Sequence, residues 1–247
     1  MKRIVFYIAV LLIYVLLYAA KPSDWALSIF FTLILAFTFV SLASLNIQWN
    51  FFTKSINKGP VASLAITFDD GPHPVNTSKI LDILEKKNAK ASFFLIGEKV
   101  KIHSDVVKRI VDEGHAIGVH SFTHSKMHGF FSTNKVEQEI MDAKNAIREV
   151  TGKEINLYRP PFGVTNPNIA KALKRTGMQC IGWNIRIFDT MATDASKLLE
   201  KAKERVNNGG SILLLHDTCD LAIEILPDLL DYCKNKGIKV LSLDEVV

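Results

Sequence analysis

The 247-residue chain is 48% hydrophobic and carries a formal net charge of +5, with a pI near 9.0. Its length allows one large domain or two small ones. Residues 1–60 contain five basic side chains and one acidic side chain, whereas residues 61–247 contain 25 basic and 24 acidic ones. The excess charge therefore belongs to the N-terminal segment, and the near-neutral remainder argues against a nucleic-acid-binding surface.

The N-terminal segment contains two long runs without charge, residues 4–20 and residues 25–52. A bilayer core of about 30 Å is crossed by roughly 17–25 helical residues, so each run is long enough to span it. Between the runs, Pro22 ends the first helix and Ser23 or Asp24 can cap the second. We predict a multi-pass membrane protein with a transmembrane hairpin, helices near 4–20 and 25–47, and a linker to residue 60.

Two other interpretations of these runs remain open. The first run could be a cleaved signal peptide, although Tyr18 stands where a small residue should precede Ala20 in a typical cleavage site. Both runs could instead be buried core helices, but the rest of the chain offers no matching apolar surface to receive them.

The charges that flank the hairpin predict its orientation. Lys2 and Arg3 precede it and two further lysines follow it, whereas Lys21 is the single basic residue of its loop. The positive-inside rule therefore favours, by a small margin, a cytoplasmic position for residues 61–247. The three scattered cysteines predict no disulfide framework and form no zinc-type pair, so any metal would be bound by histidine and carboxylate.

Residues 61–247 alternate short apolar runs with amphipathic ones. The predicted strands cover residues 61–67, 91–96, 115–120, 157–159, 179–185, 211–215 and 239–243. The predicted helices cover residues 77–87, 100–113, 134–150, 167–175, 195–206 and 221–236. This alternation indicates an α/β fold with parallel strands, and at this length a closed or nearly closed barrel is favoured over an open sheet.

Polar residues cluster after four of the predicted strands. These are residues 67–74 (TFDDGPHP), 120–124 (HSFTH), 159–163 (RPPFG) and 216–217 (HD). Asp-Gly alone is typical of a turn, and seven histidines in 247 positions give about 0.2 pairs spaced by four through chance. Because the carboxyl ends of barrel strands carry the chemistry, their joint occurrence there predicts an active site.

These motifs resemble those of the polysaccharide deacetylases with a NodB-homology domain, carbohydrate esterase family 4, across residues 61–247. The resemblance implies a distorted (β/α)7-type barrel and metal-dependent removal of N-acetyl groups from amino sugars. It makes Asp69 the general base, and His216 the general acid, with Arg159 orienting Asp69. Its metal ligands would be Asp70, His120 and His124.

The resemblance also implies a divalent cofactor, with zinc expected and cobalt or manganese as alternatives. Two imidazoles and one carboxylate leave open positions on such an ion, which activates water and polarises the amide carbonyl. The family pattern places the backbone N–H of Phe162 at the developing oxyanion, and it places Thr67 and Pro160 beside the substrate.

Two motifs depart from the family pattern. Phe162 stands where a tyrosine is usual, which removes a hydroxyl but not the backbone donor. The usual Asp-x-x-Asp-Trp is replaced by Arg186, Asp189 and Thr190 at the corresponding places. We therefore expect Asp189 to take over the contact with His216, and we expect glycan contacts that differ from those of the family.

The remaining histidines are predicted to be neither metal ligands nor catalytic residues. We predict His73 in a turn or beside the ligands, and His115 as a structural residue within a strand. We predict that His103 and His128 lie on the surface because their surroundings are polar.

The leading hypothesis is a membrane-anchored hydrolase that deacetylates an N-acetylated amino sugar of a polysaccharide or a lipid-linked saccharide, acting on a carbon–nitrogen bond other than a peptide bond. The alternative is an inactive membrane-anchored sugar-binding module of the same fold. A transmembrane scaffold is a third possibility, and no nucleic acid partner is expected.

Overall fold

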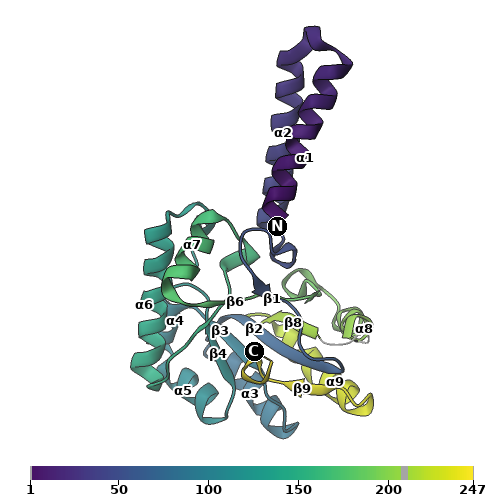
Figure 1. The fold of residues 1–247 in the computed structure, drawn as a ribbon. Helices are drawn as coiled ribbons and strands as arrows, with labels where there is room; N and C mark the ends of the chain where they lie inside the picture. The colour runs from purple at the N-terminus through teal and green to yellow at the C-terminus, as the bar shows by residue number, and fades with distance from the viewer. Residues whose placement is uncertain (1, 207–210, 247) are drawn as a thin grey trace.

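The computed structural model describes residues 2–206 and 211–246, and it contains an α/β body from which two helices project (Figure 1). These helices are α1 (Lys2–Ala20) and α2 (Trp25–Leu45), joined by a 3-10 turn at Pro22–Asp24. The rings of Phe6 and Phe39 stack between them with centroids 4.8 Å apart.

The body is built on parallel strands in the order β1-β6-β5-β4-β3-β2-β8-β7, with β9 beside the start of β2. The strands are β1 (Ser55–Ile56), β2 (Ser63–Gly71), β3 (Ser92–Leu95), β4 (Ala116–Val119), β5 (Leu157–Tyr158), β6 (Gln179–Ile181), β7 (Ile185–Arg186), β8 (Ser211–His216) and β9 (Lys239–Leu241). The predicted α/β class with parallel strands is confirmed.

Helices cover the sheet between successive strands (Figure 1). They are α3 (Asn76–Lys86), α4 (Gly97–Ile102), α5 (Ser104–Asp112), α6 (Thr133–Thr151), α7 (Pro167–Thr176), α8 (Ala195–Val206) and α9 (Asp220–Asn235). The single helix predicted over 100–113 is two helices, because His103 leaves the helical region with φ −120° and ψ 50°.

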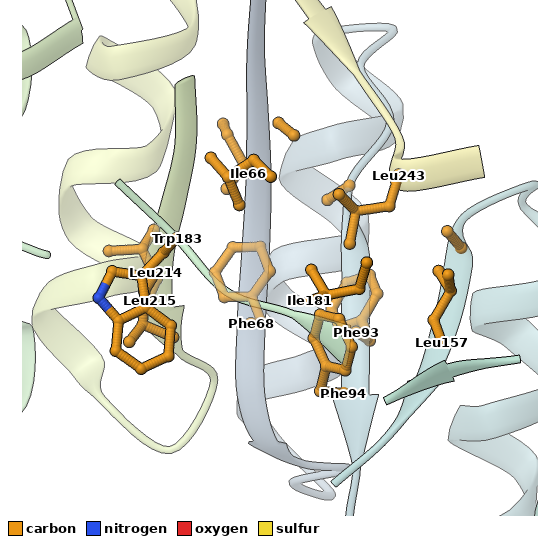
Figure 2. Packing of buried hydrophobic residues seen from close by; sticks show 14 of the residues in the cluster. Ile66, Phe68, Phe93, Phe94, Leu157, Ile181, Trp183, Leu214, Leu215 and Leu243 are labelled. Carbon is orange, nitrogen blue, oxygen red and sulfur yellow. The ribbon is translucent and has the colours of Figure 1, made fainter. Parts of the chain in front are cut away.

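The strands β2 and β8 are long apolar runs that pair with each other, and each is buried along almost its whole length. Ile66, Phe68 and Leu215 from these strands pack with Phe93 and Phe94 of β3 (Figure 2). The rings of Phe68 and Phe93 stack at 5.3 Å. This core fixes the strand ends from which the polar motifs project.

The parallel sheet curls into a half-barrel that does not close within the described residues, so the expected (β/α) barrel is confirmed in its curled sheet but not in its closure. Within residues 2–206 and 211–246, no pairing joins the edge strands β1 and β7. The chain runs from β6 to β7 through three residues without a helix, and β7 pairs with β8. At the end of β6, the carbonyl groups of Ile181 and Gly182 accept hydrogen bonds from Arg159, at 3.4 Å and 2.9 Å.

The folded body begins before residue 60. Ser55 and Ile56 of β1 pair with Cys180 and Ile181 of β6, and Ile47 is 3% exposed within the core. The predicted boundary, which assigned residues 1–60 to the hairpin and linker, therefore cuts off a strand of the sheet. A pairing of two residues carries no periodicity by which sequence patterns could reveal it.

Among the described residues, one apolar helix is long enough to cross a membrane. Residues Pro22–Leu45 have a mean hydropathy of 2.3, and 17% of the most apolar window is buried. The apolar helix Ile4–Ala20 is shorter. A membrane-spanning hairpin of both helices stays a prediction.

Candidate active site

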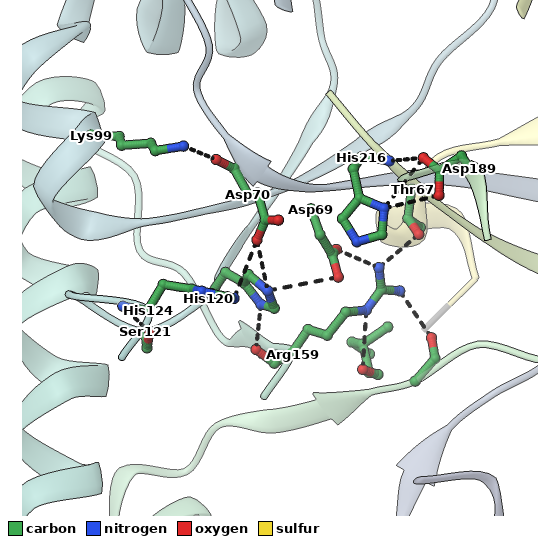
Figure 3. A network of polar contacts seen from close by, with 12 residues as sticks. Thr67, Asp69, Asp70, Lys99, His120, Ser121, His124, Arg159, Asp189 and His216 are labelled. Atoms are coloured by element: carbon green, nitrogen blue, oxygen red, sulfur yellow. Dashed lines mark hydrogen bonds and ion pairs between the residues drawn. The ribbon is translucent and has the colours of Figure 1, made fainter. Parts of the chain in front are cut away.

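A pocket of about 210 Å³ opens at the carboxyl ends of the central strands. The structure brings together in its wall Asp69, Asp70, His120, His124, Phe162 and His216. They come from the ends of β2, β4, β5 and β8. These strands lie in one part of the sheet, where β3 separates β4 from β2. The four polar motifs thus meet at one edge, as predicted from their positions after strands (Figure 3).

The adjacent carboxylates of Asp69 and Asp70 point in different directions because the backbone turns between them. Asp70 has φ 72°, in the left-handed region that non-glycine residues rarely adopt. The Nζ of Lys99 donates to the Asp70 carbonyl at 2.7 Å and holds this conformation. Asp69 consequently faces Arg159, and Asp70 faces the two histidines (Figure 3).

Asp70, His120 and His124 form a group suited to a divalent cation. Oδ1 of Asp70 lies 3.4 Å from Nε2 of His120 and 3.2 Å from Nε2 of His124. One ligand atom from each residue lies within 4.8 Å of the others. The buried Oδ1 of Asp70 has no hydrogen-bond donor among the described residues. Such an orphaned oxygen beside two imidazoles fits a metal site.

Neighbouring groups orient His120 and shift the pKa of Asp70. Nδ1 of His120 lies 2.8 Å from the Arg159 carbonyl, which leaves Nε2 directed at Asp70. Burial opposes ionisation of Asp70, but the nearby imidazoles of His120, His124 and His216 more than offset it and lower its pKa well below the ordinary value.

The Asp69 carboxylate is held by a buried arginine. Nη1 of Arg159 donates to Oδ1 of Asp69 and to Oγ1 of Thr67, each at 2.7 Å. Burial lowers the pKa of Arg159, and Asp69 opposes that shift. The guanidinium is 4.1 Å from the centroid of the Phe94 ring, so its remaining face packs against the core.

Thr67 and Pro160 lie behind the pocket rather than in its wall. Thr67 is completely buried and its hydroxyl donates to the Leu213 carbonyl at 2.7 Å, while accepting from Arg159. Pro160 is also buried. The expected direct contact of these two residues with substrate is therefore not supported by the structure, and Thr67 positions Arg159.

His216 is paired with Asp189, as expected from the departure in the fourth motif. Nδ1 of His216 lies 3.0 Å from Oδ1 of Asp189, and the His216 backbone N–H donates to Oδ2 at 2.7 Å. Burial would lower the pKa of His216, but Asp189, together with Asp69 and Asp70, raises it above the ordinary value. The imidazole is thus favoured in its protonated form.

Phe162, Trp183 and Arg186 complete the wall of the pocket. Phe162 is half exposed, with φ 59°, and its ring meets that of His124 edge to face at 4.9 Å. A Cβ at Gly163 would come within 2.4 Å of the Trp183 ring, so glycine is required there.

Several residues were misjudged or missed by sequence reasoning. His128 is completely buried, its Nε2 lies 2.9 Å from the Tyr158 hydroxyl, and burial lowers its pKa to about 4, so its predicted surface position was wrong. The available signal was the apolar Phe131, whose ring lies 5.5 Å from that of His128. His103 is partly exposed, in keeping with its predicted surface position.

His73 accepts the backbone N–H of Asn76 in a turn, as predicted. His115 is buried and structural, but it lies just before β4. Asp217 was given no role, yet it is completely buried beneath Gly71, accepts a hydrogen bond from Thr77, and burial raises its pKa to about 7.

The family model described as Polysaccharide deacetylase matches residues 57–181. The chain belongs to the polysaccharide deacetylase family.

Relatives within the polysaccharide deacetylase family are similar across three quarters of the chain. The peptidoglycan-N-acetylmuramic acid deacetylase PdaA of Bacillus subtilis is 33% identical over 75% of this chain and 71% of the relative. The peptidoglycan-N-acetylglucosamine deacetylase PgdA of Listeria monocytogenes is 32% identical over 74% of this chain. The chain spans 38% of the length of that Listeria relative.

Solved structures of the polysaccharide deacetylase family share the fold. A peptidoglycan N-acetylglucosamine deacetylase superposes with a TM-score of 0.73 at 28% identity, covering 77% of this chain and 91% of the other. A carbohydrate esterase family 4 pseudoenzyme from Bacillus anthracis also gives 0.73, at 25% identity, covering 78% and 68%. The half-barrel is therefore the fold of this family, in both active and inactive members.

Proposed function

We propose that this protein is a metal-dependent deacetylase that hydrolyses the N-acetyl amide of an amino sugar. The observation that carries the proposal is the arrangement of Asp70, His120 and His124 beside two paired acid–base groups in one pocket. The first pair is Asp69 with Arg159, and the second is His216 with Asp189. A sugar-binding module has no need of either pair.

The divalent ion would be held by Asp70, His120 and His124, and when bound it supplies Lewis-acid activation of water and of the amide carbonyl. Asp69 accepts the proton of the attacking water, and the hydrogen bond from Arg159 directs its carboxylate. The backbone N–H of Phe162 donates to the developing oxyanion.

His216 delivers a proton to the departing amine. Its pKa is raised, so the imidazolium is available near neutral pH. Asp189 fixes the proton on Nδ1, and Nε2 is therefore the atom that faces the pocket and transfers its proton.

The substrate we propose is an N-acetylated amino sugar of a glycan such as peptidoglycan, on which the relatives act. Zinc is the ion we expect, with cobalt or manganese as alternatives. We further propose that α2 anchors the protein in a membrane and that α1 lies beside it. Arg159, Asp69 and the metal ligands all lie in the body outside this anchor.

The direct test measures acetate release by the full chain in detergent. Without added metal and with zinc, cobalt or manganese, it is assayed on N-acetylglucosamine oligomers, N-acetylmuramic acid glycans and lipid-linked N-acetylglucosamine. We expect metal-dependent release that a chelator abolishes and that Asp69→Asn lowers by about 10²–10⁴-fold, the usual contribution of a general base.

A matched control is Asp231→Asn, which changes an exposed carboxylate paired with Lys87 on the surface. It should retain wild-type activity. Absence of acetate from all three substrates, together with binding of the sugars, would favour the inactive sugar-binding module over an enzyme. The similarity to a pseudoenzyme structure makes this outcome a specific alternative.

A further inference from the structure

Arg186 places a positive charge in the wall of the candidate active site. It ends β7, where it pairs in register with Leu214 of β8. Because side chains alternate along a strand, Leu214 and His216 lie on the same face of β8. All three residues line the pocket that contains Asp69 and Asp70. The guanidinium therefore lies on the side of the pocket that holds His216.

Aromatic rings hold this guanidinium without neutralising it. Its central carbon lies 4.8 Å from the ring centroid of Phe188 and 5.7 Å from that of Trp183. Phe188 adopts a left-handed backbone, with φ 61° and ψ 47°, which is costly for an aromatic residue. Across the described parts of the chain, Arg186 makes no ion pair and no side-chain hydrogen bond. Stacking leaves its five N–H donors available to a ligand.

The acidic groups of the pocket already have other partners. Asp69 is bonded to Arg159, and Asp189 is bonded to His216. Asp70 lies between the two histidines. Arg186 therefore does not serve to balance a carboxylate of the protein. It is an unbalanced cation at a position where the family pattern has an aspartate.

We propose that Arg186 determines specificity by binding an anionic substituent, a carboxylate or a phosphate, on the amino sugar whose N-acetyl group is removed. This inference rests on the proposed deacetylase function and names its substrate class. The planar fork of the guanidinium matches both anions through paired hydrogen bonds, and stacking on Phe188 and Trp183 fixes its plane.

The test compares neutral and anionic probes on the full chain in detergent with zinc. The neutral probe is an N-acetylglucosamine oligomer. The carboxylate probe is an N-acetylmuramic acid glycan of the same length, and the phosphate probe is N-acetylglucosamine 1-phosphate. We expect kcat/KM for one anionic probe to exceed the neutral value at least tenfold. The preferred probe identifies the anion as the carboxylate of a sugar substituent or as a phosphate.

Three variants separate charge from structure. Arg186→Gln should lower the ratio of anionic to neutral kcat/KM by about 10–100-fold, the usual contribution of a charge-assisted hydrogen bond. Arg186→Lys should retain part of the preference, because it keeps the charge and loses the fork. The control Arg175→Gln removes an exposed arginine on α7, paired with Glu137, and should leave the ratio unchanged.

Equal kcat/KM for all probes, or an unchanged ratio in Arg186→Gln, would overturn the assignment. If none of the probes is hydrolysed, the proposed deacetylase activity fails while the role of Arg186 is still measurable. Calorimetric binding of the same probes then decides. A preference for an anionic probe that is lost in Arg186→Gln supports the inference, and equal affinities refute it.

Discussion

At the scale of single residues, the same hydrogen bonds of Arg159 affect both the stability of the fold and the geometry of the candidate site. It is completely buried, and moving a charge out of water costs several kcal/mol unless its donors are satisfied. Asp69, Thr67 and the carbonyl of Gly182 satisfy them. The hydrogen bonds that make this burial tolerable are the same ones that direct Asp69 into the pocket.

The pairing of His216 with Asp189 predicts a specific pH dependence. His216 must be protonated to act as an acid, so kcat/KM should fall as pH rises through its elevated pKa. In Asp189→Asn the largest favourable influence on the imidazolium is lost, and the decline should move to lower pH. Profiles of kcat/KM against pH for both proteins measure this shift.

Asp194→Asn is the control for that experiment, since Asp194 lies in the same segment but is bonded to the backbone of Lys197. Its profile should match the wild type. A basic limb that stays in place in Asp189→Asn would show that another group is the acid.

At the scale of elements, the end of β2 is positioned by a close approach to β8. A Cβ at Gly71 would lie 2.2 Å from Oδ2 of Asp217, so glycine is needed where β2 leaves the sheet. Asp217 in turn accepts the Thr77 hydroxyl at the start of α3, and Thr77 accepts the His73 N–H. The turn that carries Asp69 and Asp70 is therefore held by contacts with the end of β8 and with the first turn of α3.

A double-mutant cycle tests this contact. Gly71→Ala should lower the free energy of unfolding by about 1–3 kcal/mol through overpacking. In the Asp217→Ala background the same change should cost clearly less, because the clashing oxygen is gone. Urea unfolding of the four proteins gives the coupling energy. If the two substitutions change the free energy of unfolding additively, residue 71 and Asp217 do not interact.

The short strand β1 predicts where the chain tolerates truncation. A chain that begins at residue 61 loses the pairing with β6 and the buried side chain of Ile47, and a large core side chain contributes about 2–5 kcal/mol. A chain that begins at residue 47 keeps both. We expect a clearly lower Tm for the shorter chain, and equal Tm values would contradict the assignment of β1 to the body.

At the scale of the whole molecule, two apolar helices project from a near-neutral body. Side chains such as Leu16 and Phe37 are 69% and 74% exposed along them, which water disfavours and lipid accommodates. The α/β class, the parallel order and the gathering of the four motifs were predictable, because strand periodicity and strand ends are local features of the sequence.

Other features depend on contacts that the sequence does not display. β1 belongs to the body through its pairing with β6, and Arg159 is held by the carbonyl groups of Ile181 and Gly182. His128 is buried through tertiary packing against Tyr158. None of these contacts has a periodicity, so patterns in the sequence alone could not specify them.

Membrane attachment is tested by flotation with liposomes. The full chain should float with vesicles, and it should stay with them after a high-salt wash, because an apolar helix is inserted rather than held by charge. A chain that begins at residue 47 should remain in the soluble fraction. Release of the full chain by salt would refute insertion of α2.

The last turn of α2 is bonded directly to the loop that carries the pocket wall. The hydroxyl of Ser44 donates to the Thr165 carbonyl at 2.6 Å, and the Thr165 N–H donates to the Ser44 carbonyl at 2.9 Å. Thr165 lies three residues after Phe162. If α2 lies in a bilayer, these bonds hold the pocket at a fixed distance from the membrane. Under the proposed function, only sugars that come to the membrane surface could then reach the pocket.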